Sequence, residues 1–309
     1  MRQLSREYHT SNRTAQYVAI NESNKDLLVA MADMGIFANH SFPDFWKSTV
    51  AGAKPRWLVI DGNWSEKDIR AWIQAGRENG CSIAFEPVSN VKSTRLFCSP
   101  KNGFPLGVFP NHSIDLATPN HFELQTMYEA ARRNRYLDEP EWLQVLDSFG
   151  IENSRDRFAA LGSTKISAEG ATTQCLQLLP YIPTIITKLG PEGVLLTALL
   201  HRDDPRLQDA LEEKYVLSWG PKDHPDVGGV YVRLFPAAES VENVVSVNGV
   251  GDTFLGVLVA GLAKGGKVEN LIDVAQKAAV LTLKSHESVS PDLGWLEGQL
   301  ADAAKGPGF

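Results

Sequence analysis

The sequence predicts an α/β protein in which helices flank a doubly wound, mostly parallel sheet. Short apolar runs typical of buried strands alternate with helical stretches along the chain, and this spacing indicates parallel strands joined by crossover helices. A β-branched run near the C-terminus leads through a short glycine loop into an apolar helix. The 309 residues are 43% hydrophobic and 22% charged, which is ordinary globular composition with enough apolar side chains for a sizeable core.

The first element predicted is a β-hairpin within residues 1–34. Two β-prone runs, at residues 14–20 and 26–31, flank a polar, turn-prone link. We expect this hairpin, within residues 1–34, to form a small unit of its own and residues 35–309 to form the α/β core.

The first strand–helix–strand unit of the core follows the hairpin. Residues 57–61 predict a buried strand, and residues 65–79 a helix with Ser65 as N-cap and Gly80 at its C-terminal end. Short strands are predicted at residues 82–85 and 113–118. Each predicted strand ends in polar residues, as expected at the ligand-binding edge of an open α/β sheet.

The second half begins with a polar, helical stretch at about residues 124–177. Strands are predicted at residues 184–187 and 193–197, around a glycine- and proline-containing turn, and residues 201–228 look like a surface excursion. A strand at residues 241–247, an apolar helix from Asp252 and a further helix at residues 270–285 complete the predicted order.

Composition narrows the function classes. The net charge of −7 and the pI near 5.6 argue against a nucleic-acid-binding surface, which needs clustered Lys and Arg. The three cysteines are far apart without a CxxC pair, so neither disulfides nor a zinc site is indicated. Apolar runs reach only half of the ~20 residues that a membrane span needs, and the first residues lack a signal-peptide core. We expect a cytoplasmic protein with a small-molecule partner.

The strongest candidate site is the glycine loop at residues 248–251, followed by Asp252. The free backbone N–H groups at the start of a helix, together with its dipole, favour an anion. Glycines at 249 and 251 let the backbone approach a phosphate closely. Asp252 beside such a loop is suited to accept a hydroxyl proton while the N–H groups hold phosphoryl charge. The alternative is that Asp252 is a simple helix cap.

The run Asn248-Gly249-Val250-Gly251-Asp252 resembles the second signature of PfkB (ribokinase-type) carbohydrate kinases. That resemblance implies a ribokinase-like fold, an anion hole formed by Gly249, Val250 and Gly251, and Asp252 as the catalytic base. Val250 replaces the usual alanine, which is neutral if only its N–H is used. Ser246 and Val247 stand where the family often has Asp-Thr, which weakens the case for a monovalent-cation site.

Two further motifs occur in the family's order. Asn120 and Glu123 match its N-x-x-E motif, which implies Mg²⁺ held through water; the same spacing is also an ordinary capping box. Lys188, Gly190 and Gly193 lie where the family has T-L-G-x-x-G at the nucleotide. Lys188 replaces the usual threonine, so a hydroxyl contact is lost and a charge is gained.

The candidate acceptor residues are Asp61, Asn63 and Lys92, at strand ends that face the presumed cleft. The Glu86-Pro87 pair, Lys92 and the segment 281–293 most resemble pseudouridine kinases within the family. The resemblance therefore implies ATP- and Mg²⁺-dependent phosphorylation of a primary hydroxyl of a sugar or nucleoside, with pseudouridine 5′-phosphate as the expected product.

The resemblance covers nearly the whole chain but not the family's first strands, which carry its Gly-Gly signature and its sugar-binding aspartate. The resemblance therefore implies an N-terminally truncated version of the fold. Residues 1–34 would form a residual hairpin lid, and residues 35–309 the kinase core, with the nucleotide-binding half at its C-terminal end. An alternative function follows, a non-catalytic kinase-like protein that binds nucleotide without a complete acceptor site. Exposed sheet edges and an exposed part of the core also favour association, so we expect poor solubility or a homo-oligomer.

Overall fold

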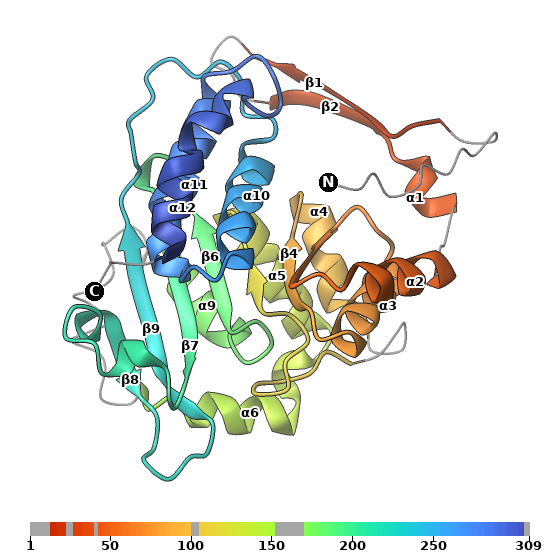
Figure 1. Cartoon of the computed structure of the whole chain (residues 1–309). Coiled ribbons are helices and arrows are strands. Elements are labelled where there is room, and N and C mark those ends of the chain that lie inside the picture. The colour runs from red at the N-terminus through yellow and green to blue at the C-terminus, as the bar shows by residue number, and fades with distance from the viewer. Residues whose placement is uncertain (1–12, 23–26, 40–42, 100–104, 152–169, 306–309) are drawn as a thin grey trace.

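A computed structural model describes residues 13–22, 27–39, 43–99, 105–151 and 170–305 (Figure 1). Within these residues, seven strands form one sheet in the order β3-β4-β5-β6-β7-β9-β8. The first four strands in this order are parallel, and β7, β9 and β8 continue the sheet with antiparallel pairings. The strands are β3 (Trp57–Asp61), β4 (Ser82–Glu86), β5 (Leu116–Ala117), β6 (Thr184–Lys188), β7 (Val194–His201), β8 (Val216–Trp219) and β9 (Val227–Phe235).

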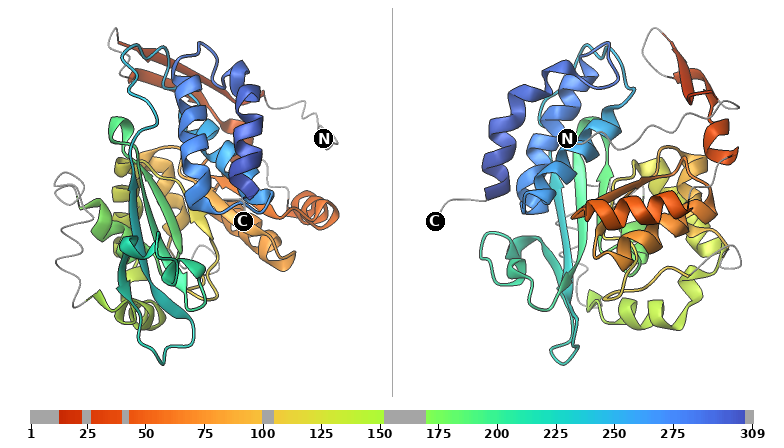
Figure 2. Two further views of the ribbon diagram at one scale, coloured as in Figure 1. Left: turned by 60° about the vertical axis from the view of Figure 1, so that its left-hand side comes forward. Right: turned by 45° about the vertical axis from the view of Figure 1, so that its right-hand side comes forward.

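Helices cover both faces of this sheet, as the right-hand view in Figure 2 shows. Alternate strand residues point to opposite faces. Phe85 and Leu195 therefore join one core cluster, with residues of α3, α5 and α9, while Ala84 and Leu196 join another, with residues of α10 and α11. The predicted doubly wound α/β fold is confirmed. The α-helices are α1 (Gly35–Asn39), α2 (Pro43–Ala53), α3 (Glu66–Glu78), α4 (Asn90–Ser93), α5 (His121–Arg133), α6 (Pro140–Asp147), α9 (Ala171–Leu178), α10 (Val250–Ala263), α11 (Val268–Leu283) and α12 (Glu297–Lys305).

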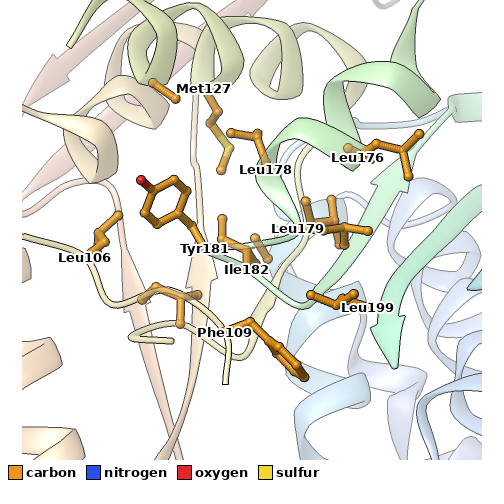
Figure 3. Close-up of a cluster of buried hydrophobic side chains, with 14 of the residues drawn as sticks. Leu106, Phe109, Met127, Leu176, Leu178, Leu179, Tyr181, Ile182 and Leu199 are labelled. Atoms are coloured by element: carbon orange, nitrogen blue, oxygen red, sulfur yellow. The ribbon is translucent and has the colours of Figure 1, made fainter. Parts of the chain in front are cut away.

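The core cluster on the α5 and α9 side positions the site (Figure 3). Met127 of α5 and Ile182, just before β6, are both fully buried in it. Tyr181 is also buried, and its hydroxyl donates a hydrogen bond of 2.6 Å to the carbonyl of Tyr136. This packing ties α5 to the segment that enters β6, so the N-terminus of α5 and the C-terminal end of β6 meet at the same edge of the sheet.

The predicted hairpin forms as β1 (Gln16–Asn21) paired with β2 (Leu27–Asp33) in antiparallel register. It lies beyond the sheet edge at which α10 begins (Figure 1). Val18 pairs with Met31 and Ile20 with Val29, so these four apolar side chains share one face, and each is 44–58% exposed. The division of the chain at residue 34 remains a prediction.

Three of the predicted elements are corrected by the structure. Residues 241–247 form no strand: the N–H groups of Val245 and Ser246 both donate to the carbonyl of Leu283, so the segment is bound to the end of α11 instead of a neighbouring strand. The predicted excursion at 201–228 contains β8, which pairs with β9 at the edge of the sheet. The strand predicted at 113–118 is limited to the pair Leu116–Ala117.

The membrane-span and cysteine predictions can also be compared with the structure. No helix in the described part of the chain is long and apolar enough to cross a membrane. Cys81, Cys98 and Cys175 are each buried as free thiols, and burial raises the pKa of Cys175 to about 11, which keeps that thiol protonated and unreactive at neutral pH.

Candidate active site

The glycine loop ends in the first turn of α10. Gly249 is the N-cap, with φ of 72°, and a Cβ placed there would lie 1.7 Å from the carbonyl oxygen of Ser288. Only glycine fits this left-handed conformation and this close approach. Among the described residues no side chain caps the helix, so the N–H groups of Val250, Gly251 and Asp252 are available to an anion at the N-terminus of α10.

Asp252 is the third residue of α10 and not its N-cap, so the alternative of a simple capping aspartate does not match the structure. Its side chain is exposed. Within the described residues it makes no side-chain hydrogen bond or ion pair that would occupy the carboxylate. The group is therefore free to take a proton from a bound hydroxyl beside the loop N–H groups.

Asn120 and Glu123 form the capping box that the sequence allowed. The Glu123 N–H donates to Asn120 Oδ1 at 2.9 Å, and the Asn120 N–H donates to Glu123 Oε2 at 2.8 Å. Burial raises the pKa of Glu123; the Lys188 ammonium opposes this rise, and the carboxylates of Glu86 and Asp252 add to it. The charges of Glu86, Lys188 and Asp252 therefore all act on Glu123 at this edge of the sheet.

Lys188, at the end of β6, lies next to the glycine loop. A Cβ on Gly251 would be only 2.9 Å from Lys188 Nζ. Nζ donates to Glu86 Oε1 at 3.3 Å, while the Thr118 hydroxyl donates to Glu86 Oε2 at 2.7 Å. Sequence reasoning noted Glu86 only within a subfamily pattern and missed Thr118; the signal for both was a polar residue directly after a buried strand.

The two predicted nucleotide glycines belong to the turn between β6 and β7. Gly190 is exposed with φ of 61°, and Gly193 is buried with φ of 100°. A Cβ on Gly193 would lie 2.0 Å from the carbonyl oxygen of Phe235, so this position requires glycine for packing. The turn leaves the sheet at the edge where Lys188 lies, and nucleotide binding by its backbone remains a prediction.

The candidate acceptor residues form a second cluster at the same edge. Lys92 Nζ donates to Asn63 Oδ1 at 2.5 Å, and the Asn63 N–H donates to Asp61 Oδ1 at 2.7 Å. Burial lowers the pKa of Lys92, the Arg95 charge lowers it further, and Asp61 opposes the change. Asp61 is in register with Glu86 on β4, which places this cluster beside the Lys188 group.

The residues at this edge fit a water-mediated Mg²⁺ better than a metal bound by the protein alone. Among the described residues, no group of three or more His, Cys, Asp and Glu side chains is arranged to hold a metal ion. Mg²⁺ dehydrates reluctantly and is usually held by one or two carboxylates together with substrate phosphates. Glu123 uses only Oε2 in its capping box, and nearby Glu86 and Asp252 leave an excess of negative charge that a divalent cation would balance.

Comparison with known proteins places this geometry in a family. The family model described as pfkB family carbohydrate kinase matches residues 110–293, more than half of the chain, and this range contains the capping box, Lys188 and the glycine loop. The chain belongs to the PfkB family. Membership of the PfkB family supports sugar or nucleoside kinase activity.

A curated relative is the pseudouridine-metabolizing bifunctional protein of Schizosaccharomyces pombe, 35% identical over 289 residues. The alignment covers 92% of this PfkB chain and 35% of the relative, so the chain spans about a third of that protein's length. Ribokinase from Cryptococcus neoformans, solved with ADP, superposes with a TM-score of 0.55 at 16% identity, over 94% of this chain and 73% of that one. Burkholderia thailandensis nucleoside kinase, solved with inosine, gives a TM-score of 0.50 at 12% identity, over 94% and 68%. The two structures confirm the ribokinase-like fold.

Proposed function

We propose that this protein transfers the γ-phosphoryl group of ATP to a primary hydroxyl of a ribosyl nucleoside, with pseudouridine as acceptor and its 5′-phosphate as product. One observation carries the proposal: Asp252 is exposed in the first turn of a helix, and no side chain among the described residues pairs with it or caps the helix N–H groups. The similarity to a pseudouridine-metabolizing protein supports the choice of acceptor, and the PfkB membership supports the reaction class.

The proposed step begins at Asp252. Its carboxylate accepts the proton of the acceptor hydroxyl as that oxygen forms a bond to the γ-phosphorus, and the bond from phosphorus to the β,γ-bridging oxygen breaks, leaving its electron pair on ADP. The N–H groups of Gly249, Val250 and Gly251 hold the charge on the transferred group. Mg²⁺, when bound with ATP, would neutralise phosphate charge, with Glu123 and Asn120 holding its water shell.

Asp61, Asn63 and Lys92 are proposed to bind the acceptor. They form one hydrogen-bonded cluster at the end of β3 and the start of α4, on the edge of the sheet that carries the phosphate-binding groups. Carboxylate, amide and ammonium groups are suited to hydrogen-bond the hydroxyl and carbonyl groups of a nucleoside. Their role is to hold the attacking hydroxyl within reach of Asp252, because transfer depends on that placement.

The test combines turnover with binding. ADP release from ATP and Mg²⁺ is measured with pseudouridine, uridine, adenosine and ribose as acceptors, and ATP affinity is measured separately by titration calorimetry. We expect turnover to be fastest with pseudouridine. ATP binding without phosphorylation of any acceptor would favour the alternative, a non-catalytic nucleotide-binding protein. Absence of ATP binding at millimolar concentration would overturn the kinase proposal itself.

A further inference from the structure

Lys188 has donor capacity that its protein contacts do not use. Its ammonium carries three N–H donors, yet across the described residues it makes one hydrogen bond, to Glu86 Oε1. The side chain is 19% exposed and that of Glu86 is 7% exposed, so the pair is largely withdrawn from water. A largely buried ion pair is weak support for stability, because desolvation offsets the attraction. Stability alone therefore does not account for this lysine.

The position of the ammonium points to a ligand. Nζ lies close to Gly251, since a Cβ there would be 2.9 Å from it, so a larger residue at this position would displace the ammonium. The ammonium and the uncapped N–H groups of α10 therefore converge on one place. A positive charge and oriented N–H dipoles at the same spot are the pattern that stabilises phosphoryl oxygens during transfer.

Glu86 controls where that charge lies. Its Oε2 accepts the Thr118 hydroxyl at 2.7 Å, which fixes the carboxylate, and its Oε1 accepts from Lys188. Both partners come from the ends of neighbouring strands, so the backbone of the sheet sets their spacing. Toward the phosphoryl group, Glu86 therefore acts through Lys188 and is a positioning residue.

We propose that Lys188 is a fixed cation that contacts the γ-phosphoryl group of ATP during transfer, with Glu86 holding it in place. This inference rests on the proposed function. The ammonium compensates the charge on the γ-phosphoryl oxygens while the bond to the bridging oxygen breaks and the bond to the acceptor oxygen forms. A small monovalent cation can replace it only if the lysine side chain is removed, because Nζ then vacates a space beside the Glu86 carboxylate.

The experiment compares Lys188→Ala with Lys277→Ala, a control whose lysine lies on the surface of α11 in an ion pair with Asp273. In buffers with choline as the only added cation besides Mg²⁺, we expect kcat of Lys188→Ala to fall by about 10²–10³-fold, the range for losing one oxyanion-stabilising donor. Adding NH₄⁺ or K⁺ at 100 mM should raise the kcat of Lys188→Ala at least tenfold. The same addition should leave the kcat of wild type and of Lys277→Ala unchanged. Glu86→Gln should lower kcat more than it raises KM for ATP.

A binding readout separates this inference from the proposed function. If Lys188 contacts the γ-phosphate, Lys188→Ala should reduce the ratio of ATP to ADP affinity by at least tenfold, whether or not any acceptor is phosphorylated. Lys188→Arg, which keeps a positive charge, should lose less of that ratio. An unchanged ratio, or an unchanged kcat in choline buffer, would overturn the assignment, as would a kcat loss without cation rescue. If wild type binds ATP but phosphorylates no acceptor, the ratio of ATP to ADP affinity by itself tests whether Lys188 contacts the γ-phosphate.

Discussion

Replacing Asp252 by Asn tests the central residue with the smallest change of shape. Asp252 is exposed and has no hydrogen-bonded partner in the described residues, so the change breaks no contact of the folded protein. The stability at risk is the interaction of its charge with the dipole of α10, about 0.3–1 kcal/mol. We therefore expect nearly unchanged folding and ATP affinity, because the loop N–H groups remain.

The expected effect on transfer is much larger. Loss of a general base lowers the rate by about 10²–10⁴-fold, which corresponds to about 2.7–5.5 kcal/mol of transition-state stabilisation at ~1.36 kcal/mol per tenfold. The assay is initial-rate ADP release at saturating ATP and acceptor, beside urea unfolding of the same preparation. The loss of rate should exceed the loss of stability by several kcal/mol, which a purely structural role would not produce.

The matched control is Glu141→Gln, which also removes an exposed acidic charge from the first turn of a helix, α6. It should reproduce the small stability change and leave turnover unaltered. Full turnover by Asp252→Asn would refute the reasoning and leave Asp252 as an ordinary first-turn residue. Equal losses of rate in both variants would show that the effect is not specific to Asp252 and would also refute the reasoning.

The remaining predictions concern the loop, the core and the hairpin. Gly249→Ala should abolish nucleotide binding in calorimetry. A residue with a Cβ pays about 1–2 kcal/mol for the left-handed φ at this position, and the Ser288 carbonyl blocks the added atom. The control Gly256→Ala, within α10 and with open space around the added Cβ, should bind nucleotide normally. Burial raises the pKa of Asp115, but hydrogen bonds from His112 and the Ile83 N–H and the charge of Arg77 lower it more, to below its usual range. Its stabilisation is therefore present at neutral pH and lost as the pH falls through the depressed pKa. Asp115→Asn should cost about 1–3 kcal/mol at pH 7 in urea unfolding and much less near pH 3, and a gap independent of pH would contradict this. If the apolar hairpin face mediates association, Val18→Lys should shift light-scattering mass toward the monomer, and a wild-type monomer would remove the basis for that expectation.

Local sequence signals predicted much of the fold. Ser65 caps α3 as expected, with its hydroxyl accepting from the Asp68 N–H, and the hairpin pairs as its alternating pattern indicated. The glycine loop precedes α10, and Asn120 with Glu123 forms the capping box. All of these depend on residues within a few positions of one another, where propensity and capping chemistry act directly.

The predicted strands are wrong or incomplete where a segment distant in sequence determines whether a strand forms. Residues 241–247 have a strand-like composition, but the N–H groups of Val245 and Ser246 donate to the Leu283 carbonyl on α11, and the segment pairs with no strand of the described residues. Edge strand β8 was missed because its pairing with β9 bridges a turn-rich segment with no hairpin signal. Strand composition alone cannot specify a strand, since backbone hydrogen bonds need a partner that the local sequence does not contain.

The α/β class, the order of most elements and the glycine loop with Asp252 can be predicted from local sequence, because each is encoded in consecutive residues. The proximity of Lys188, Glu86 and Gly251, which lie on β6, β4 and α10, follows only from the packing of the folded chain. The side chain of Lys188 came to the loop because parallel strands bring their carboxyl ends to one edge, and the packing of α10 on that sheet sets the distance. Such long-range packing brings the separate motifs into one site. The spacing of residues along the chain does not indicate it.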